Sequence, residues 1–133
     1  GGHNHRLNLS EGILIKDNHI VQHSIKETLI EAKKHKQHKI EVEVDNLKQL
    51  SIVLPFKPDG VLLDNFTPTE ITKAISIIKA HPSNHQIFVE ASGGINQKNI
   101  KKYLIKDLSA ISIGALTHQA QSKNIKLVKK QTD

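Results

Sequence analysis

Short apolar segments recur along the chain at nearly even intervals. Each is rich in β-branched residues and largely apolar, as expected for strands that are buried on both faces of a parallel sheet. The predicted strands are residues 12–15, 40–44, 61–63, 87–89 and 110–113.

Helical segments are predicted between these strands, and two of them begin with a capping box. In residues 24–27 and 67–70, a Ser or Thr is followed three positions later by Glu, the pair that caps a helix N-terminus. The predicted helices run over 24–36, 47–53, 67–80 and 97–106, and Asn96 is expected to cap the last. This alternation of strands and helices predicts an α/β fold with parallel strands.

The length of the chain limits the architecture. A complete (β/α)8 barrel typically takes about 250 residues, whereas this chain has 133. The predicted strands therefore form an open sheet or a partial (β/α) barrel, in one domain over 1–133 without a linker. The chain begins with Gly-Gly and contains no methionine, so we expect a processed or partial chain.

Composition narrows the class of protein. The absence of cysteine excludes disulfide scaffolds and thiolate nucleophiles. No apolar run approaches the roughly 18 residues of a membrane span, and no secretory signal is visible. The net charge of +6 suggests nucleic acid, but the lysines are scattered and the few aromatic residues offer little base stacking. We expect a cytoplasmic protein that binds neither nucleic acid nor membrane.

Polar side chains collect where the predicted strands end, which is where parallel α/β folds place their reactive groups. These ends carry Lys16, Glu41, Glu43, Asp45, Asp64, Glu90 and Ser92. In residues 41–45 the three carboxylates alternate with valine, so we expect them on one face. A solvated edge strand would show the same alternation. In mid-sheet, however, buried carboxylates need a cation or hydroxyl donors, which favours Mg²⁺ or a polyhydroxyl ligand.

Two glycine-bearing turns follow the later strands. Gly93 and Gly94 precede the predicted helix over 97–106, and Gly114 follows the strand over 110–113. Backbone N–H groups in such turns can approach an anion, and a helix N-terminus adds a favourable dipole. We therefore predict phosphate binding, although a Gly-Gly pair is more often a simple turn.

The basic and imidazole side chains add three candidates. Several histidine pairs have spacings typical of zinc ligands, but without cysteine we do not predict a zinc site. His5, beside Arg6, and His118, shortly after Gly114, are better placed to bind a ligand. Arg6 is the only arginine among 19 basic residues, which suggests a position that needs the planar guanidinium fork.

Residues 1–6, 14–19, 40–47, 60–66, 90–95 and 112–118 resemble, in order and spacing, the motifs of the quinolinate phosphoribosyltransferase family (nicotinate-nucleotide pyrophosphorylase, decarboxylating). The resemblance covers essentially the whole chain. It implies a two-domain enzyme with an N-terminal α/β sandwich and an incomplete α/β barrel. This chain resembles the C-terminal barrel without the sandwich and the first barrel strand. The family also implies a homodimer or higher homo-oligomer, whose partner subunit contributes a basic residue to the site.

By this resemblance, the parent protein is a pentosyltransferase. It would join quinolinate to phosphoribosyl pyrophosphate and release pyrophosphate and carbon dioxide, giving nicotinate mononucleotide for NAD biosynthesis. His5 and Arg6 match positions that bind the quinolinate carboxylates, and Lys16 matches a lysine of the same pocket. Glu43 and Asp64 match an acidic pair that holds the ribose hydroxyls and Mg²⁺. Lys16, Glu43 and Asp64 are the predicted catalytic residues.

The resemblance also assigns the loops around the 5′-phosphate. The matching residues are Ser92, Gly93, Gly94, Gly114 and His118. Glu41 and Asp45 are expected to support the acidic pair rather than to touch substrate. Two alternatives stay open: a non-catalytic remnant that retains only anion binding or dimer association, and a related transferase for another aromatic acid. We expect the isolated fragment to be inactive.

Overall fold

The computed structural model describes residues 12–16, 24–35, 38–82 and 86–114. Its strands form one sheet in the order β1-β2-β3-β4-β5, and every neighbouring pair is parallel. The elements are β1 (Gly12–Ile15), α1 (Ile25–Ala32), β2 (Lys39–Val44), α2 (Leu47–Val53), β3 (Gly60–Asp64), α3 (Pro68–Ala80), β4 (Phe88–Ser92) and β5 (Ala110–Ile111). The predicted α/β class is therefore confirmed.

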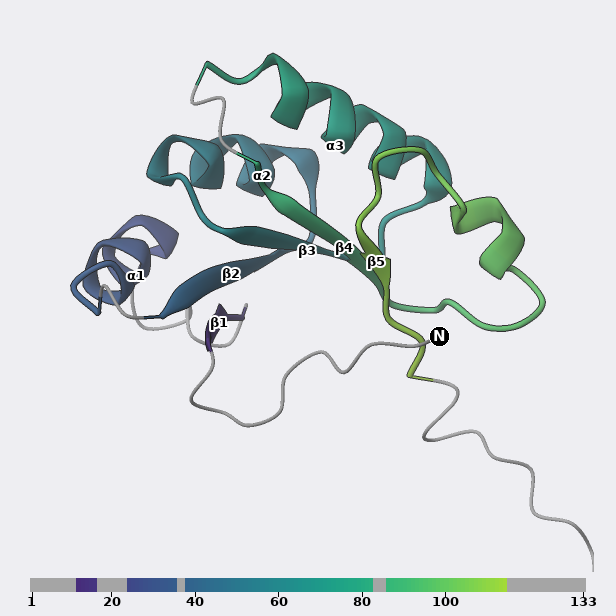
Figure 1. Cartoon of the computed structure of the whole chain (residues 1–133), viewed down its shortest axis with the longest axis horizontal. Coiled ribbons are helices and arrows are strands. Elements are labelled where there is room, and N and C mark those ends of the chain that lie inside the picture. The colour runs from purple at the N-terminus through teal and green to yellow at the C-terminus, as the bar shows by residue number, and fades with distance from the viewer. Residues whose placement is uncertain (1–11, 17–23, 36–37, 83–85, 115–133) are drawn as a thin grey trace, which may run out of the picture.

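The helices and the sheet enclose the core between them. Figure 1 shows α2 and α3 over one face of the sheet, and α1 packs next to α2 and β1. Fully buried side chains of the sheet and the helices form one apolar cluster, which includes Leu29, Val42, Val44, Leu50, Val53, Val61, Leu63 and Ile71. In the described part of the chain, no helix is both long and apolar enough to cross a bilayer.

Both predicted capping boxes are present. The Ser24 hydroxyl accepts from the Glu27 backbone, and the Glu27 carboxylate accepts from the Ser24 backbone, at the start of α1. Thr67 and Glu70 make the same reciprocal pair at the start of α3. The strong start signals explain why these two helices begin where the sequence predicts.

The predicted helix over 97–106 is wrong. Only the 3-10 helix η3 (Ile100–Tyr103) forms there. The Asn96 side chain accepts from the Lys98 backbone at 2.9 Å, while Asn99 accepts from the Asn96 backbone at 2.8 Å and donates to the Gly94 carbonyl at 3.0 Å. Because these side chains bond to the local backbone in a turn, they compete with the α-helix that Asn96 was expected to cap.

The sheet is open in the described part of the chain, with β1 and β5 at its two edges. This agrees with the expectation of an open or partial barrel. The acidic strand β2 lies inside the sheet, paired with β1 on one side and β3 on the other. The interpretation of residues 41–45 as a solvated edge strand is therefore wrong, and their carboxylates need another explanation.

Candidate active site at the strand ends

A cavity of about 360 Å³ lies at the C-terminal ends of the strands. It is lined by Leu14, Lys16, Glu43, Leu62, Asp64, Glu90, Ser92 and Ser112. The parallel register explains this gathering, because it pairs Glu43 with Leu62, Leu62 with Glu90, and Asp64 with Ser92 across neighbouring strands. Side chains at paired positions lie on the same face of a sheet. Four predicted site residues from separate parts of the sequence, Lys16, Glu43, Asp64 and Ser92, therefore share one cavity.

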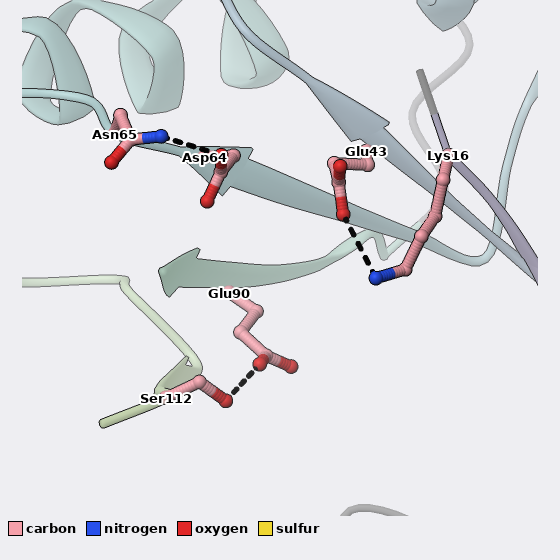
Figure 2. Close-up of polar contacts among 6 residues, drawn as sticks. All are labelled: Lys16, Glu43, Asp64, Asn65, Glu90 and Ser112. Carbon is pink, nitrogen blue, oxygen red and sulfur yellow. Dashed lines mark hydrogen bonds and ion pairs between the residues drawn. The ribbon is translucent and has the colours of Figure 1, made fainter. Parts of the chain in front are cut away.

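Lys16 brings a positive charge into this acidic cavity. Its Nζ lies 3.9 Å from Oε2 of Glu43, which is too long for a hydrogen bond but close enough for an ion pair. The Glu43 side chain is only 12% exposed, whereas that of Lys16 is 49% exposed. Figure 2 shows the two side chains pointing toward one another from β2 and the end of β1. The half-exposed ammonium can therefore attract an anionic ligand while it compensates the charge of Glu43.

Asp64 ends β3, next to the strand that carries Glu43. Its Oδ2 accepts a hydrogen bond of 2.6 Å from the Asn65 side-chain amide. No group of three or more His, Asp or Glu side chains in the described ranges is arranged to hold a metal ion. Glu43 and Asp64 are two oxygen donors, and Mg²⁺ is often bound by one or two carboxylates together with substrate phosphates. These two carboxylates are therefore the residues that would hold a magnesium ion here, with its other ligands coming from outside the described residues.

Glu90 and Ser112 line the same cavity but were not among the predicted site residues. Glu90 is 1% exposed and is the one charged residue buried in the described part of the chain. The Ser112 hydroxyl donates a hydrogen bond to Oε1 of Glu90, as Figure 2 shows. Glu90 was expected among the polar residues at the strand ends, but without a site role. It lies two positions before Ser92 in β4, and so on the same face.

Gly93 needs to be glycine at its position. Its φ is +87°, and a Cβ there would lie 2.3 Å from Oδ1 of Asn65. Gly94 also has a positive φ, of +65°, but apart from its chain neighbours no described atom lies within 4 Å of where its Cβ would stand. A Cβ at Gly114 would also meet open space. Because the helix over 97–106 does not form, its dipole cannot assist an anion at this turn. The Gly93-Gly94 turn can therefore offer an anion its backbone amides, without the dipole of an α-helix.

Glu41 in β2 and Asp45, just after it, do not line this cavity. Glu41 faces the same side of the sheet as Glu43 but lines a second cavity, of about 760 Å³, toward the N-terminal ends of the strands. Asp45 is exposed, and its carboxylate accepts from the Gln49 side chain of α2 at 3.3 Å. The expectation that all three carboxylates share one face is thus wrong for Asp45, because the strand ends at Val44 and the chain turns into α2.

Three candidate residues lie outside the described residues. They are His5, Arg6 and His118. Their assignment to the quinolinate carboxylates and the 5′-phosphate stays a prediction.

Comparison with known proteins places the chain in a family. The family model for the C-terminal domain of quinolinate phosphoribosyl transferase matches residues 1–128. The chain belongs to this family. The match confirms the resemblance that the motifs predicted, over nearly the whole chain.

Curated relatives of this quinolinate phosphoribosyl transferase domain are named as pyrophosphorylases. The probable nicotinate-nucleotide pyrophosphorylase (carboxylating) of Methanocaldococcus jannaschii is 43% identical over 131 residues, which cover 96% of this chain and 46% of that protein. The human nicotinate-nucleotide pyrophosphorylase (carboxylating) is 34% identical over 131 residues, covering 96% of this chain and 43% of the human protein. The chain therefore spans less than half the length of these two relatives.

Solved structures share the fold. The nicotinate-nucleotide pyrophosphorylase from Ehrlichia chaffeensis has a TM-score of 0.80 at 36% identity, and the similarity covers 93% of this chain and 44% of that one. NadC from Streptococcus pyogenes has a TM-score of 0.78 at 32% identity, covering 90% and 41%. These similarities confirm the parallel α/β fold of the domain.

Proposed function

We propose that the natural protein carrying this chain transfers the phosphoribosyl group of phosphoribosyl pyrophosphate to quinolinate. The products would be nicotinate mononucleotide, pyrophosphate and carbon dioxide, in a step of NAD biosynthesis. The observation that carries the proposal is the cavity in which Lys16, Glu43, Asp64 and Ser92 meet at the strand ends, in a chain that belongs to the quinolinate phosphoribosyl transferase family.

In this proposal, Glu43 and Asp64 hold the ribose hydroxyls and a magnesium ion. The support is their position on neighbouring strands, where both offer carboxylate oxygens to one cavity. Lys16 lies 3.9 Å from Glu43. When bound, the metal would neutralise the charge that develops on the pyrophosphate leaving group. The two carboxylates would also stabilise positive charge on the ribose as the bond to pyrophosphate breaks, because fixed charges aimed at a transition state need no reorganisation.

The basic residues would bind the acid substrate. Lys16 is half exposed in the cavity, where an ammonium group favours a carboxylate. His5 and Arg6 are proposed to complete this pocket because they match the family motif. Ser92, Gly93 and Gly94, together with Gly114 and His118, are proposed to surround the 5′-phosphate.

Magnesium dependence, assembly as a homodimer or higher homo-oligomer and a cytoplasmic location belong to the same proposal. The family resemblance supports each of them. A basic residue from a partner subunit would complete the site, so catalysis would depend on the assembly.

The proposal is tested by product formation in the natural protein. Nicotinate mononucleotide is measured by chromatography after incubation with quinolinate, phosphoribosyl pyrophosphate and Mg²⁺. We expect product with the wild type, and a loss of turnover of roughly 100-fold or more in Asp64→Asn, the range seen when a transition-state contact is removed.

The control is Asp107→Asn, which removes an exposed carboxylate paired with Lys79 at 2.6 Å, outside the cavity. Its turnover should stay within about twofold, since surface ion pairs contribute little. An absence of product with the wild type, or equal rates in the two variants, would contradict the proposal.

A further inference from the structure

Asn65 follows the catalytic-site residue Asp64 in an unusual backbone conformation. Its φ is +55°, in the left-handed region that few residues other than glycine adopt. Asparagine tolerates this region better than most side chains do. Asn65 therefore allows β3 to turn sharply at the point where its last carboxylate enters the cavity.

The Asn65 side chain holds that carboxylate. Its Nδ2 donates to Oδ2 of Asp64 at 2.6 Å, and Figure 2 shows the amide pointing at the acidic group. A hydrogen bond to an ionised acceptor is stronger than one between neutral groups. The amide thus restricts the rotation of the Asp64 carboxylate.

The same residue also contacts the glycine turn after β4. The Asn65 backbone N–H donates to the Ser92 carbonyl at 2.9 Å. Gly93 packs so closely on Asn65 that a Cβ there would lie 2.6 Å from its backbone nitrogen. Asn65 therefore contacts both the Asp64 carboxylate and the turn that is proposed to bind phosphate.

We propose that Asn65 is a positioning residue, which fixes the Asp64 carboxylate relative to the Ser92-Gly93 turn. Phosphoribosyl pyrophosphate carries its pyrophosphate and its 5′-phosphate on opposite ends of the ribose. A site that binds both ends needs its carboxylate and its glycine turn at a set separation. The two hydrogen bonds of Asn65, to Asp64 and to Ser92, would fix that separation. The inference rests on the proposed function, because it assigns those two groups to one substrate.

An identical dipeptide elsewhere in the chain has a different role. Asp45-Asn46 follows β2, but Asn46 is extended, with φ of −159°, and its side chain accepts from the Gln49 backbone as the N-cap of α2. Neither asparagine lines the cavity, but Asn65 donates to a carboxylate that does, Asp64. Asn46 therefore provides a matched control: the same residue type after the same acid, without the contact to a site carboxylate.

The experiment measures ligand binding in the natural protein without turnover. Phosphoribosyl pyrophosphate is titrated by calorimetry with and without Mg²⁺, in the absence of quinolinate, and unfolding is followed by circular dichroism. Asn65→Gly removes the side-chain amide together with Cβ and allows the positive φ without strain. Asn65→Ala removes the amide and also strains the backbone.

We expect both Asn65 variants to weaken Mg²⁺-dependent binding by a similar factor of roughly tenfold or more, as when a partner of a metal-binding carboxylate is removed. Only Asn65→Ala should unfold at a clearly lower temperature, and Asn46→Gly should bind like the wild type. If Asn65→Gly binds like the wild type while Asn65→Ala is weakened, Asn65 has a purely structural role and the inference is overturned. If the wild type does not bind phosphoribosyl pyrophosphate, the proposed function fails and the inference fails with it.

Discussion

The two faces of the sheet carry different chemistry, although their residues alternate along the same strands. On the helix-covered face, Val44 and Leu63 are fully buried in the core. On the opposite face, Glu43 and Asp64, their immediate neighbours in the sequence, line the polar cavity. Each of the strands β2 and β3 thus contributes to the core with one face and to the candidate site with the other. We therefore expect substitutions on the first face to reduce stability, and substitutions on the second to reduce ligand binding and turnover.

The largest effect on stability is expected at Leu63. Leu63→Ala should lower the free energy of unfolding by about 2–5 kcal/mol, because it leaves a void in a closely packed core. Urea denaturation measures this change. Leu62→Ala is the comparison, since Leu62 lines the cavity from the same strand and, although only 8% exposed, lies outside the apolar core cluster, so its loss should be smaller. A loss for Leu62→Ala as large as that for Leu63→Ala would contradict the division between the faces.

Glu90 sharpens the comparison, because it lies on the cavity face and is nevertheless buried. Glu90→Ala removes the acceptor of the part-buried Ser112 hydroxyl, so it should lower the free energy of unfolding by less than the roughly 1–3 kcal/mol that a fully buried donor loses without its partner. Glu90→Gln keeps an oxygen acceptor and should cost clearly less. Urea denaturation of the two variants measures the difference. Equal stability of Glu90→Ala and the wild type would show that the buried carboxylate does not stabilise the fold.

The smallest effect is expected in the helix layer, at the start of α3. The Thr67 hydroxyl, together with the Thr67 backbone N–H, donates to the Glu70 carboxylate and lowers its pKa from the ordinary value of 4.5. Because the pKa is lower in the folded state, the unfolded state binds the proton more readily in this range. The contribution of the cap is therefore present above pH 4.5 and is lost as the pH falls through the folded pKa.

Glu70→Gln tests this pH dependence. Stability measured by urea denaturation at about pH 7 and about pH 3 should depend less on pH in Glu70→Gln than in the wild type. The difference should be small, since Glu70 is exposed. An identical pH dependence would mean that the capping box contributes nothing through its charge.

Much of the fold could be predicted from the sequence because its signals are local. The capping boxes at Ser24 and Thr67 specify where two helices begin, and short β-branched segments mark the strands. The segment after Asn96 could not be predicted in this way. Its asparagine side chains bond to a turn rather than to a helix, and propensity alone does not distinguish the two outcomes.

The candidate site was predictable in part for a related reason. Lys16 and Asp64 were recognisable because polar residues at the ends of parallel strands meet at one edge of the sheet. The departure of Asp45 toward Gln49 and the contact of Asn65 with Gly93 depend on how the chain turns after each strand. Such turns depend on three-dimensional packing. The sequence alone therefore did not show that Asn46 caps a helix whereas Asn65 donates to Asp64.

The most direct test of the candidate site compares Glu43, in β2, with Asp45, which follows the strand. Glu43→Gln and Asp45→Asn each neutralise one acid, but only Glu43 lines the cavity. In the natural protein, with quinolinate, phosphoribosyl pyrophosphate and Mg²⁺, we predict that Glu43→Gln lowers the rate of nicotinate mononucleotide formation by roughly 100-fold or more. Asp45→Asn should remain within about twofold of the wild type. Similar rates for the two variants would contradict the assignment of this cavity as the phosphoribosyl transfer site.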